Sequence, residues 1–290
     1  MKLRSGRDLL RTHIIQVPYD SGRRDFRMGN GPSRLLEAAF ASPEEVFVEK
    51  VVVEELPFEL GTTFRVLRSL SERVKASTRN NCLPLVLAGG CISCVGTLSG
   101  LSPQPIAVVW MDAHADFNTP ETTVSGFIDG MALAAATGRC WRNLTSSISG
   151  FQPVSERNVI LMGARDLDQD ERRLLERSDI SWVDTATIRD RGLENAIGAA
   201  LGKVAPERVY LHVDLDVLDR SEAGVNEFSS AGGLTVAELL RAVEVIAHSR
   251  SIVAAAITAY DPSYDTDGKA LRAAQQLVKE LQTVAGIAVS

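Results

Sequence analysis

The sequence predicts an α/β fold in which a parallel sheet is covered by helices on both faces. Short apolar runs rich in β-branched residues alternate along the chain with segments of helical periodicity. Parallel strands need crossover connections, and the crossing helices bury both faces of the sheet. Strands are expected at 13–17, 49–55, 83–89, 105–113, 158–164, 180–183, 208–217 and 251–258, and helices at 32–41, 64–77, 171–178 and 236–249.

The 290 residues are expected to form one domain, 1–290, because no linker, repeat or shift in composition divides them. Hydrophobic residues make up 45% of the chain and charged residues 23%, ordinary values for a protein with a substantial core. The four cysteines are too few and too irregularly spaced for a disulfide framework. Cys82, Cys94 and Cys140 are therefore predicted to be reduced thiols of the core.

The charge distribution argues against nucleic acid as a partner. The formal net charge is -6, and the 31 lysines and arginines are scattered along the chain. No segment approaches the ~20 apolar residues of a membrane span, and no long apolar run follows the basic residues at the start. We therefore expect a cytoplasmic protein without a membrane partner, whose ligand is a small molecule.

Two acidic clusters follow apolar runs, at the position where ligands bind in open α/β sheets. The first is the segment DAHAD at 112–116, and the second is the segment HVDLDVLD at 212–219. Within each cluster the potential ligands are spaced by two residues, which places them on one side of an extended strand. The side chains concerned are Asp112, His114, Asp116, His212, Asp214 and Asp216, with Asp219 in the turn that follows.

So many carboxylates at one sheet edge predict a metal centre. They would repel one another and resist burial unless a cation compensated their charge. Ligation dominated by carboxylates suits divalent ions, Mn most readily, with Zn, Fe or Co as alternatives. Two such ions ~3.5 to 4 Å apart can share a water, lower its pKa and present hydroxide to an electrophilic carbon, so the expected chemistry is hydrolysis. The alternative is that single aspartates cap helices or face solvent.

At this point the sequence resembles the arginase and agmatinase family, whose motifs are a GGDHS-like loop, a DAHxD segment and a DxDxxDP segment. The resemblance spans nearly the whole chain. It also rests on the glycine-rich entry and GP helix start at 20–38, LMGARDLD at 161–168, GGLT at 232–235 and ITAYDP at 257–262. It implies a three-layer αβα fold with a parallel sheet of about eight strands, and assembly into a homo-oligomer, a trimer or hexamer.

The resemblance also implies roles for the acidic residues. The residues matching Asp112 and Asp214 bridge both metals in the family. His114 and Asp216 would complete one metal site. Asp116 would serve the other site and would also orient the bridging hydroxide, which makes it a candidate catalytic residue.

Residues 118–126 read NTPETTVSG, which is similar to the segment NTPxTTxSG of the arginase branch. In that branch the residues matching Asn118, Thr123 and Ser125 hold the α-carboxylate of the substrate. Those matching Asp168 and Glu171 serve its α-amino group. The alternative for Asn118 and Thr123 is ordinary hydrogen bonding within a loop.

The sequence departs from the family pattern at the loop GGCIS, residues 89–93, which lacks the histidine ligand of the first metal. Alignment without a gap puts Ile92 in its place, whereas deletion of one residue puts Cys91 there. Cys91 is a candidate thiolate ligand, because a divalent metal deprotonates a nearby thiol. A thiolate would shift the preference from Mn towards Zn or Fe. The alternative is a packed thiol beside a single metal at the second site.

Three further positions bear on the chemistry. Asp129 takes the place of the family's proton-shuttling histidine, and is either a second catalytic residue or a solvated loop carboxylate. Ala259 replaces the glutamate that pairs with the substrate guanidinium in arginases, so either the guanidine is modified or another carboxylate, such as Glu227, takes over. His212 shares the strand face of Asp214, and we expect it to contact the ligands without binding the metal.

The function favoured by these observations is metal-dependent hydrolysis of a C–N bond in a guanidino or hydroxyguanidino amino acid. Attack of metal-bridging hydroxide would release urea or hydroxyurea, and N-hydroxyarginine is favoured over free arginine. One alternative is a non-catalytic protein of the arginase fold that binds a small ligand or partner. The other is a hydrolase with one metal and a different substrate, such as an amide or a peptide-borne arginine.

Overall fold

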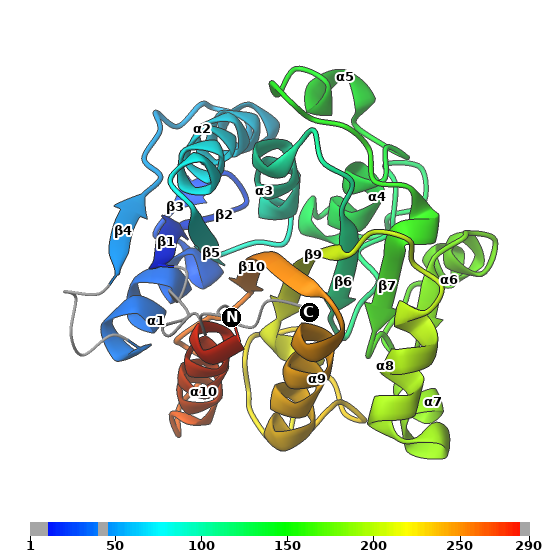
Figure 1. Ribbon diagram of the computed structural model, residues 1–290. Helices are drawn as coiled ribbons and strands as arrows, with labels where there is room; N and C mark the ends of the chain where they lie inside the picture. Colours follow the sequence, from blue (N-terminus) through cyan, green and yellow to red (C-terminus); the bar gives the residue numbers. More distant parts are fainter. Residues whose placement is uncertain (1–10, 40–45, 285–290) are drawn as a thin grey trace, which may run out of the picture.

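The computed structural model describes residues 11–39 and 46–284, and its centre is a sheet of eight strands that all pair in parallel (Figure 1). This confirms the predicted fold class. Seven of the eight apolar runs each contribute one strand, and the run at 49–55 overlaps a strand only at residues 49 and 50. In spatial order the strands are β4 (Phe47–Lys50), β1 (Arg11–Val17), β5 (Cys82–Ala88), β10 (Ser251–Thr258), β9 (Arg208–Asp214), β6 (Ala107–Met111), β7 (Val159–Met162) and β8 (Ser181–Val183).

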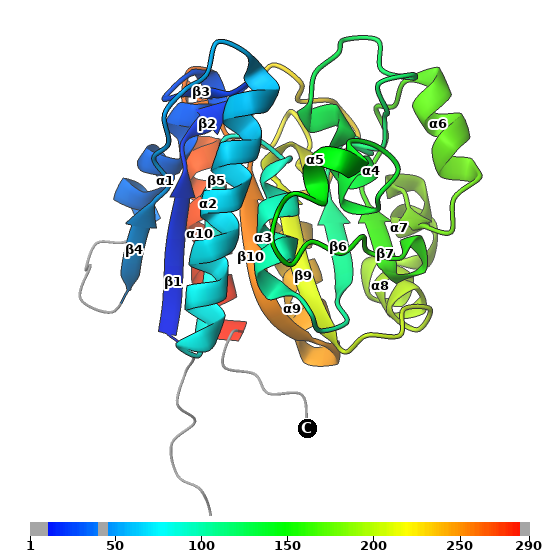
Figure 2. The same ribbon diagram turned by 90° about the horizontal axis from the view of Figure 1, so that it is seen from above.

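Helices form a layer on each side of this sheet, and Figure 2 shows α2 and α3 in front of the strands with α9 and α10 behind them. The front layer consists of α2 (Glu59–Arg79), α3 (Ser93–Leu101) and α4 (Ala132–Ala136). The rear layer consists of α1 (Gly31–Ala39), α8 (Leu193–Leu201), α9 (Val236–Ser249) and α10 (Lys269–Val284). The other α-helices and strands described are α5 (Arg142–Thr145), α6 (Gln169–Glu176), α7 (Thr185–Arg191) and the antiparallel pair β2 (Tyr19–Asp20) and β3 (Arg23–Arg24). Short 3-10 helices lie at Arg27–Asn30, Asp129–Met131, Glu156–Asn158 and Leu215–Val217.

Side chains that point alternately to the two faces of each strand explain how the sheet packs against both helix layers. In β6, Val108 and Trp110 pack into the core under α2 and α3, whereas Val109 and Met111 pack into the core under α8, α9 and α10. All four side chains are fully buried. Because successive side chains of a strand point to opposite faces, an unbroken apolar run is what a strand covered on both sides requires.

Several local expectations were wrong or only partly testable. The strand expected at 49–55 lies earlier, because β4 ends at Lys50 and only Val51 continues the ladder, through its N–H to Gln16. The helix expected at 32–41 begins at Gly31, and its last two residues lie outside the described part of the chain. Cys94 and Cys140 are buried free thiols as expected, but Cys82 at the start of β5 is only half-buried.

The carboxyl ends of four neighbouring strands, β5, β10, β9 and β6, lie side by side in the middle of the sheet. Both acidic clusters, the GGCIS loop and the ITAYDP segment follow these strands directly. The fold therefore brings together residues that are far apart in the sequence, such as Cys91 and Thr258, which are separated by 167 positions. Among the described residues, no helix is long and apolar enough to cross a membrane.

Candidate metal centre and active site

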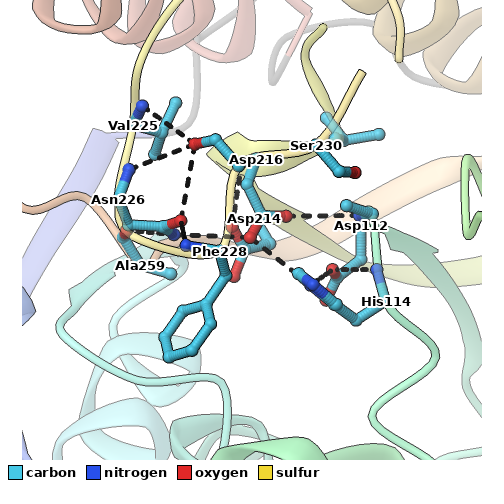
Figure 3. A network of polar contacts seen from close by, with 12 residues as sticks. Asp112, His114, Asp214, Asp216, Val225, Asn226, Phe228, Ser230 and Ala259 are labelled. Atoms are coloured by element: carbon cyan, nitrogen blue, oxygen red, sulfur yellow. Dashed lines mark hydrogen bonds and ion pairs between the residues drawn. The ribbon is translucent and has the colours of Figure 1, made fainter. Parts of the chain in front are cut away.

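Two groups of potential ligands meet at this sheet edge and have one carboxylate in common. Cys91, Asp112 and Asp214 offer ligand atoms that lie within 4.8 Å of one another. Asp112, His114 and Asp216 form a second group by the same measure. Figure 3 shows the three aspartates and the imidazole directed towards one another. Two groups joined by a shared carboxylate match the layout of a centre for two ions.

Backbone and side-chain donors fix the carboxylates in place. Asp112 Oδ1 accepts the N–H of His114 at 2.7 Å, and Asp112 Oδ2 accepts the indole N–H of Trp110 at 3.0 Å. Asp214 Oδ1 accepts the N–H of Asp216 at 2.9 Å (Figure 3). His114 Nδ1 lies 3.3 Å from Asp112 Oδ1 and 3.4 Å from Asp216 Oδ2. These contacts orient the ligand atoms before any ion binds.

The cluster holds four buried carboxylates, with the imidazole of His114 as the one cationic group among them. Burial, and then the carboxylate of Asp216, raise the pKa of Asp112 to about 6. Burial and the neighbouring carboxylates also raise the pKa of Asp214 and of Asp116. Burial opposes protonation of His114, but the carboxylates of Asp216 and Asp112 outweigh it and raise the imidazole pKa. Divalent cations would remove this repulsion, so the donor set fits a metal centre.

Asp116 supplies an independent sign that a cation belongs here. Its side chain is buried, and its Oδ2 atom has no hydrogen-bond partner among the described residues. Its backbone is left-handed, with φ 50, which is uncommon outside glycine and is found at functional sites. A buried carboxylate oxygen without a partner is costly unless a ligand satisfies it. Asp116 is not part of either group of three.

Cys91, and not Ile92, lies at the cluster. The Cys91 thiol donates to Asp214 Oδ2 at 3.0 Å, whereas the Ile92 side chain packs into the core beneath α2 and α3. Burial, and then Asp214, raise the pKa of the Cys91 thiol, so the sulfur is protonated when no cation is bound. Binding of a metal at this sulfur would therefore release a proton.

A cavity of about 480 Å³ opens above the two groups. Of the five residues predicted to bind substrate, four line it: Asn118, Ser125, Asp168 and Glu171. Thr123 does not line it, and its hydroxyl accepts the N–H of Gly126 at 3.0 Å.

The lining residues are already organised by hydrogen bonds. Asn118 Nδ2 donates to Asp168 Oδ2 at 3.2 Å, and Asn118 Oδ1 accepts the hydroxyl of Thr122 at 2.9 Å. Glu171 accepts the N–H of Phe117 at 2.9 Å, and burial raises its pKa to about 7. Asn118 thus takes part in loop hydrogen bonding as well as facing the cavity.

Asp129 lines the same cavity as a buried side chain, so it is not a solvated loop carboxylate. Its Oδ1 atom accepts the N–H of Ile92 at 2.8 Å, which ties it to the GGCIS loop. Burial raises the pKa of Asp129 to about 7, with smaller contributions in the same direction from Asp20 and Glu59 and an opposing one from Arg27. The carboxyl group can therefore carry a proton near neutral pH.

Comparison with known proteins decides the family of the chain. The model of the family described as "Arginase family" matches residues 10–283. The chain belongs to the arginase family. This confirms the predicted resemblance and the predicted enzyme class, a hydrolase that acts on linear amidines.

Known arginases match this chain over nearly its full length. The arginase of Bacillus subtilis is 29% identical over 285 residues, which cover 92% of this chain and 96% of that protein. The arginase of Staphylococcus aureus (strain COL) is 31% identical over 287 residues, covering 91% and 94%. The crystal structure of arginase from Bacillus cereus superposes with a TM-score of 0.85 at 28% identity, covering 93% of this chain and 98% of the other.

Within this arginase-family site, Ala259 itself brings no carboxylate to the cavity wall. Ala259 lines the cavity, and its carbonyl accepts the amide of Asn226 at 2.8 Å (Figure 3). Glu227 also lines the cavity, but Arg27 Nη1 lies 3.0 Å from its carboxylate. Arg27, which also pairs with Asp20 at 2.8 Å, partly neutralises Glu227 and makes it a weaker replacement for a glutamate at position 259.

Sequence reasoning missed several residues that support the arginase-family site. Asn226 Nδ2 lies between Ala259 O and Asp216 Oδ2, 3.3 Å from the latter, and nothing in the sequence signalled it. Arg165 donates to the backbone carbonyl of Asp216 within the second cluster and to that of Ser230 in the loop that follows it. Trp110 could have been found, because it stands two residues before Asp112 on the same strand face.

Proposed function

We propose that this arginase-family hydrolase cleaves a C–N bond of a hydroxyguanidino amino acid, with N-hydroxyarginine as the model substrate, and releases hydroxyurea. The observation that carries the proposal is Ala259 in the cavity wall, whose side chain has no carboxylate to pair with a guanidinium, while Glu227 is paired with Arg27. An N-hydroxy substituent makes a guanidine less basic, so such a substrate binds without a charged partner. A protonated guanidinium would pay for its desolvation without that compensation.

The other end of the cavity supports an amino-acid substrate. Asn118 and Ser125 present an amide and a hydroxyl that can hold an α-carboxylate, with Thr123 shaping the same loop. Asp168 and Glu171 present carboxylates that can accept an α-ammonium group. Separate contacts to the two charged groups of the α-carbon would fix the register of the substrate and bring its guanidine carbon over the metal centre.

The proposed cofactor is a pair of divalent ions, with Mn the first candidate and Zn, Fe or Co the alternatives. Cys91, Asp112, Asp116 and Asp214 would hold one ion, and Asp112, His114, Asp214 and Asp216 the other. When bound, such ions lower the pKa of a shared water and supply the nucleophile. A sulfur donor favours Zn or Fe more than an imidazole does.

Asp129 is proposed to donate the proton that the leaving amine needs. Replacement of Asp129 by Asn removes this proton but keeps the side-chain volume and an oxygen that can accept the N–H of Ile92. We expect kcat to fall by roughly 10²- to 10⁴-fold, the usual contribution of general acid catalysis, while metal content is unchanged. Steady-state kinetics with metal analysis of the same sample tests this, and a kcat within twofold of wild type would exclude the role.

The function itself is tested by a substrate screen. Purified protein loaded with Mn, Fe, Co or Zn is incubated with guanidino and hydroxyguanidino amino acids, and release of urea or hydroxyurea is measured. The proposal expects kcat/KM to be higher for N-hydroxyarginine than for arginine with at least one metal. Faster turnover of arginine with every metal would refute the substrate assignment, and no turnover of any compound would favour the binding-protein alternative.

Replacement of Ala259 by Glu should shift the preference towards arginine. The new carboxylate would extend into the cavity and pair with a guanidinium, so we expect the ratio of kcat/KM for arginine to that for N-hydroxyarginine to rise by about tenfold or more, which corresponds to about 1.4 kcal/mol. The matched control is Ala259→Gln, which adds nearly the same volume without charge. An equal shift in both variants would mean that size, and not charge, sets the preference.

A further inference from the structure

A continuous chain of buried hydrogen bonds ends on the sulfur of Cys91. The hydroxyl of Tyr210 lies 2.9 Å from His212 Nδ1, and His212 Nε2 lies 3.2 Å from Thr258 Oγ1. Thr258 Oγ1 in turn lies 3.2 Å from Cys91 Sγ. Three side chains from two neighbouring strands thus lead to a single atom of the metal centre. None of them belongs to either group of ligands.

The sheet holds this chain rigidly. Tyr210 and His212 are two residues apart in β9, on the same face as Asp214, and Thr258 is paired with Asp214 in the register of β9 and β10. The ring of Trp110 stacks on the ring of His212 at 3.6 Å between centroids and 8° between planes. Tyr210, His212 and Thr258 all have 0% exposure, so water cannot replace any of these contacts.

The donors and acceptors along this chain of hydrogen bonds are assigned from its end at Cys91. A thiol has one hydrogen, and that of Cys91 is donated to Asp214 Oδ2. Cys91 Sγ, at 3.2 Å, is closer to the Thr258 hydroxyl than Val213 O and Asp214 Oδ2, both at 3.5 Å. We therefore assign the hydroxyl hydrogen to the sulfur and take His212 Nε2 as the donor to Thr258 Oγ1. A neutral imidazole has one donor and one acceptor nitrogen, so Nδ1 accepts from the hydroxyl of Tyr210.

We propose that Thr258 is a positioning residue for Cys91, and that the Tyr210, His212 and Thr258 chain donates a hydrogen bond to the Cys91 thiolate in the metal-loaded protein. The inference rests on the proposed role of Cys91 as a ligand. The donated bond would fix the sulfur on the side of the metal centre and withdraw electron density from it, without adding a charge to an already crowded site. Hydrogen bonds to ligands from surrounding residues commonly change metal affinity by about 10- to 100-fold.

The test uses the full chain loaded with Co(II), whose bond to a thiolate gives a sulfur-to-metal charge-transfer band in the near ultraviolet. Thr258→Val removes the hydroxyl at nearly constant volume, and Thr258→Ser keeps it. We expect the valine variant to retain the band at lower energy, because an unbonded sulfur is a stronger electron donor, and to bind Co(II) about 10- to 100-fold more weakly. The serine variant should match wild type in both measurements.

Two further variants make the result decisive. Cys91→Ser should lose the band, and Tyr210→Phe, which alters the far end of the chain, should shift it in the same direction as Thr258→Val but less. If wild type shows the band and its energy is the same in Thr258→Val and Tyr210→Phe, Thr258 does not position Cys91, and the hydrolase proposal is unaffected. If wild type shows no band, Cys91 is not a ligand and the inference falls for that reason. Activity in the substrate screen reports separately on the proposed function.

Discussion

The Asp214→Asn variant is expected to lose both bound metal and hydrolysis. Asp214 is fully buried at the end of β9, where it belongs to the group with Cys91 and Asp112 and receives the N–H of Asp216. An amide has the same shape but carries no charge and offers one oxygen fewer, so it cannot hold a divalent ion between two groups. We expect turnover to drop by at least about 10³-fold, and metal content after dialysis to fall from two equivalents to below one.

The Asp214→Asn substitution should not destabilise the fold. Burial and neighbouring carboxylates raise the pKa of Asp214, so the neutral amide removes a repulsion that the metal-free protein must tolerate. Metal-free Asp214→Asn should therefore unfold in urea at the same or a higher concentration than metal-free wild type. Asp190→Asn, an exposed change on α7 far from the cavity, is the matched control and should leave metal content and activity unchanged. Full activity in Asp214→Asn would refute the assignment of the site.

The stability of the metal-free protein is expected to fall as the pH rises from about 5 to 7. Burial raises the pKa of Asp112 to about 6 and the pKa values of Asp129 and Glu171 to about 7, and it also raises those of Asp116 and Asp214. Between the unfolded and folded pKa values the folded state binds more protons, so the free energy of unfolding decreases with pH. This stabilisation is complete below about pH 4 and is lost as the pH passes the raised values.

Two imidazoles oppose this trend but do not reverse it. Burial lowers the pKa of His212 to about 3 and also lowers that of His13, so both groups make the folded state less stable as the pH falls below about 6.5. The five carboxyl groups named above act in the other direction. Each proton that the folded state binds in excess of the unfolded state lowers the free energy of unfolding by about 1.4 kcal/mol per unit rise in pH. Urea unfolding of chelator-treated protein at several pH values measures the net slope.

Metal should invert this dependence. Ligands must lose their protons to bind a cation, so affinity rises with pH and the loaded protein gains the stability that the metal-free protein loses. The difference in free energy of unfolding between loaded and metal-free protein should therefore widen from pH 5 to pH 7. A metal-free protein whose stability rises steadily over this range would show that the carboxylates are not crowded together as described.

The parts of the fold that the sequence predicted well are those governed by one local rule. Apolar runs located seven of the eight strands, because strands covered on both faces consist mainly of apolar residues. The period of two in DAHAD predicted that Asp112 and His114 would face the same way, and both belong to one group. The end of β4 was missed because an edge strand is set by its single neighbour, β1, and not by its own apolar residues.

The parts that could not be predicted depend on contacts between distant segments. Asn226 reaches Ala259 across 33 positions, and Cys91 reaches Thr258 across 167, so no local pattern signals either contact. The pairing of Glu227 with Arg27, which weakens Glu227 as a guanidinium partner, depends on how two loops meet above the sheet. The predicted oligomer, a trimer or hexamer, stays a prediction.

The central claim is that aspartates from two strands converge so closely that divalent ions must lie between them. Anomalous diffraction at the manganese absorption edge, from crystals grown with Mn²⁺, tests it most directly. We expect two peaks ~3.5 to 4 Å apart, with Asp112 and Asp214 in contact with both and Cys91 Sγ in contact with one. Absence of any peak between Asp112 and Asp214 in crystals that show saturating metal elsewhere would contradict the account.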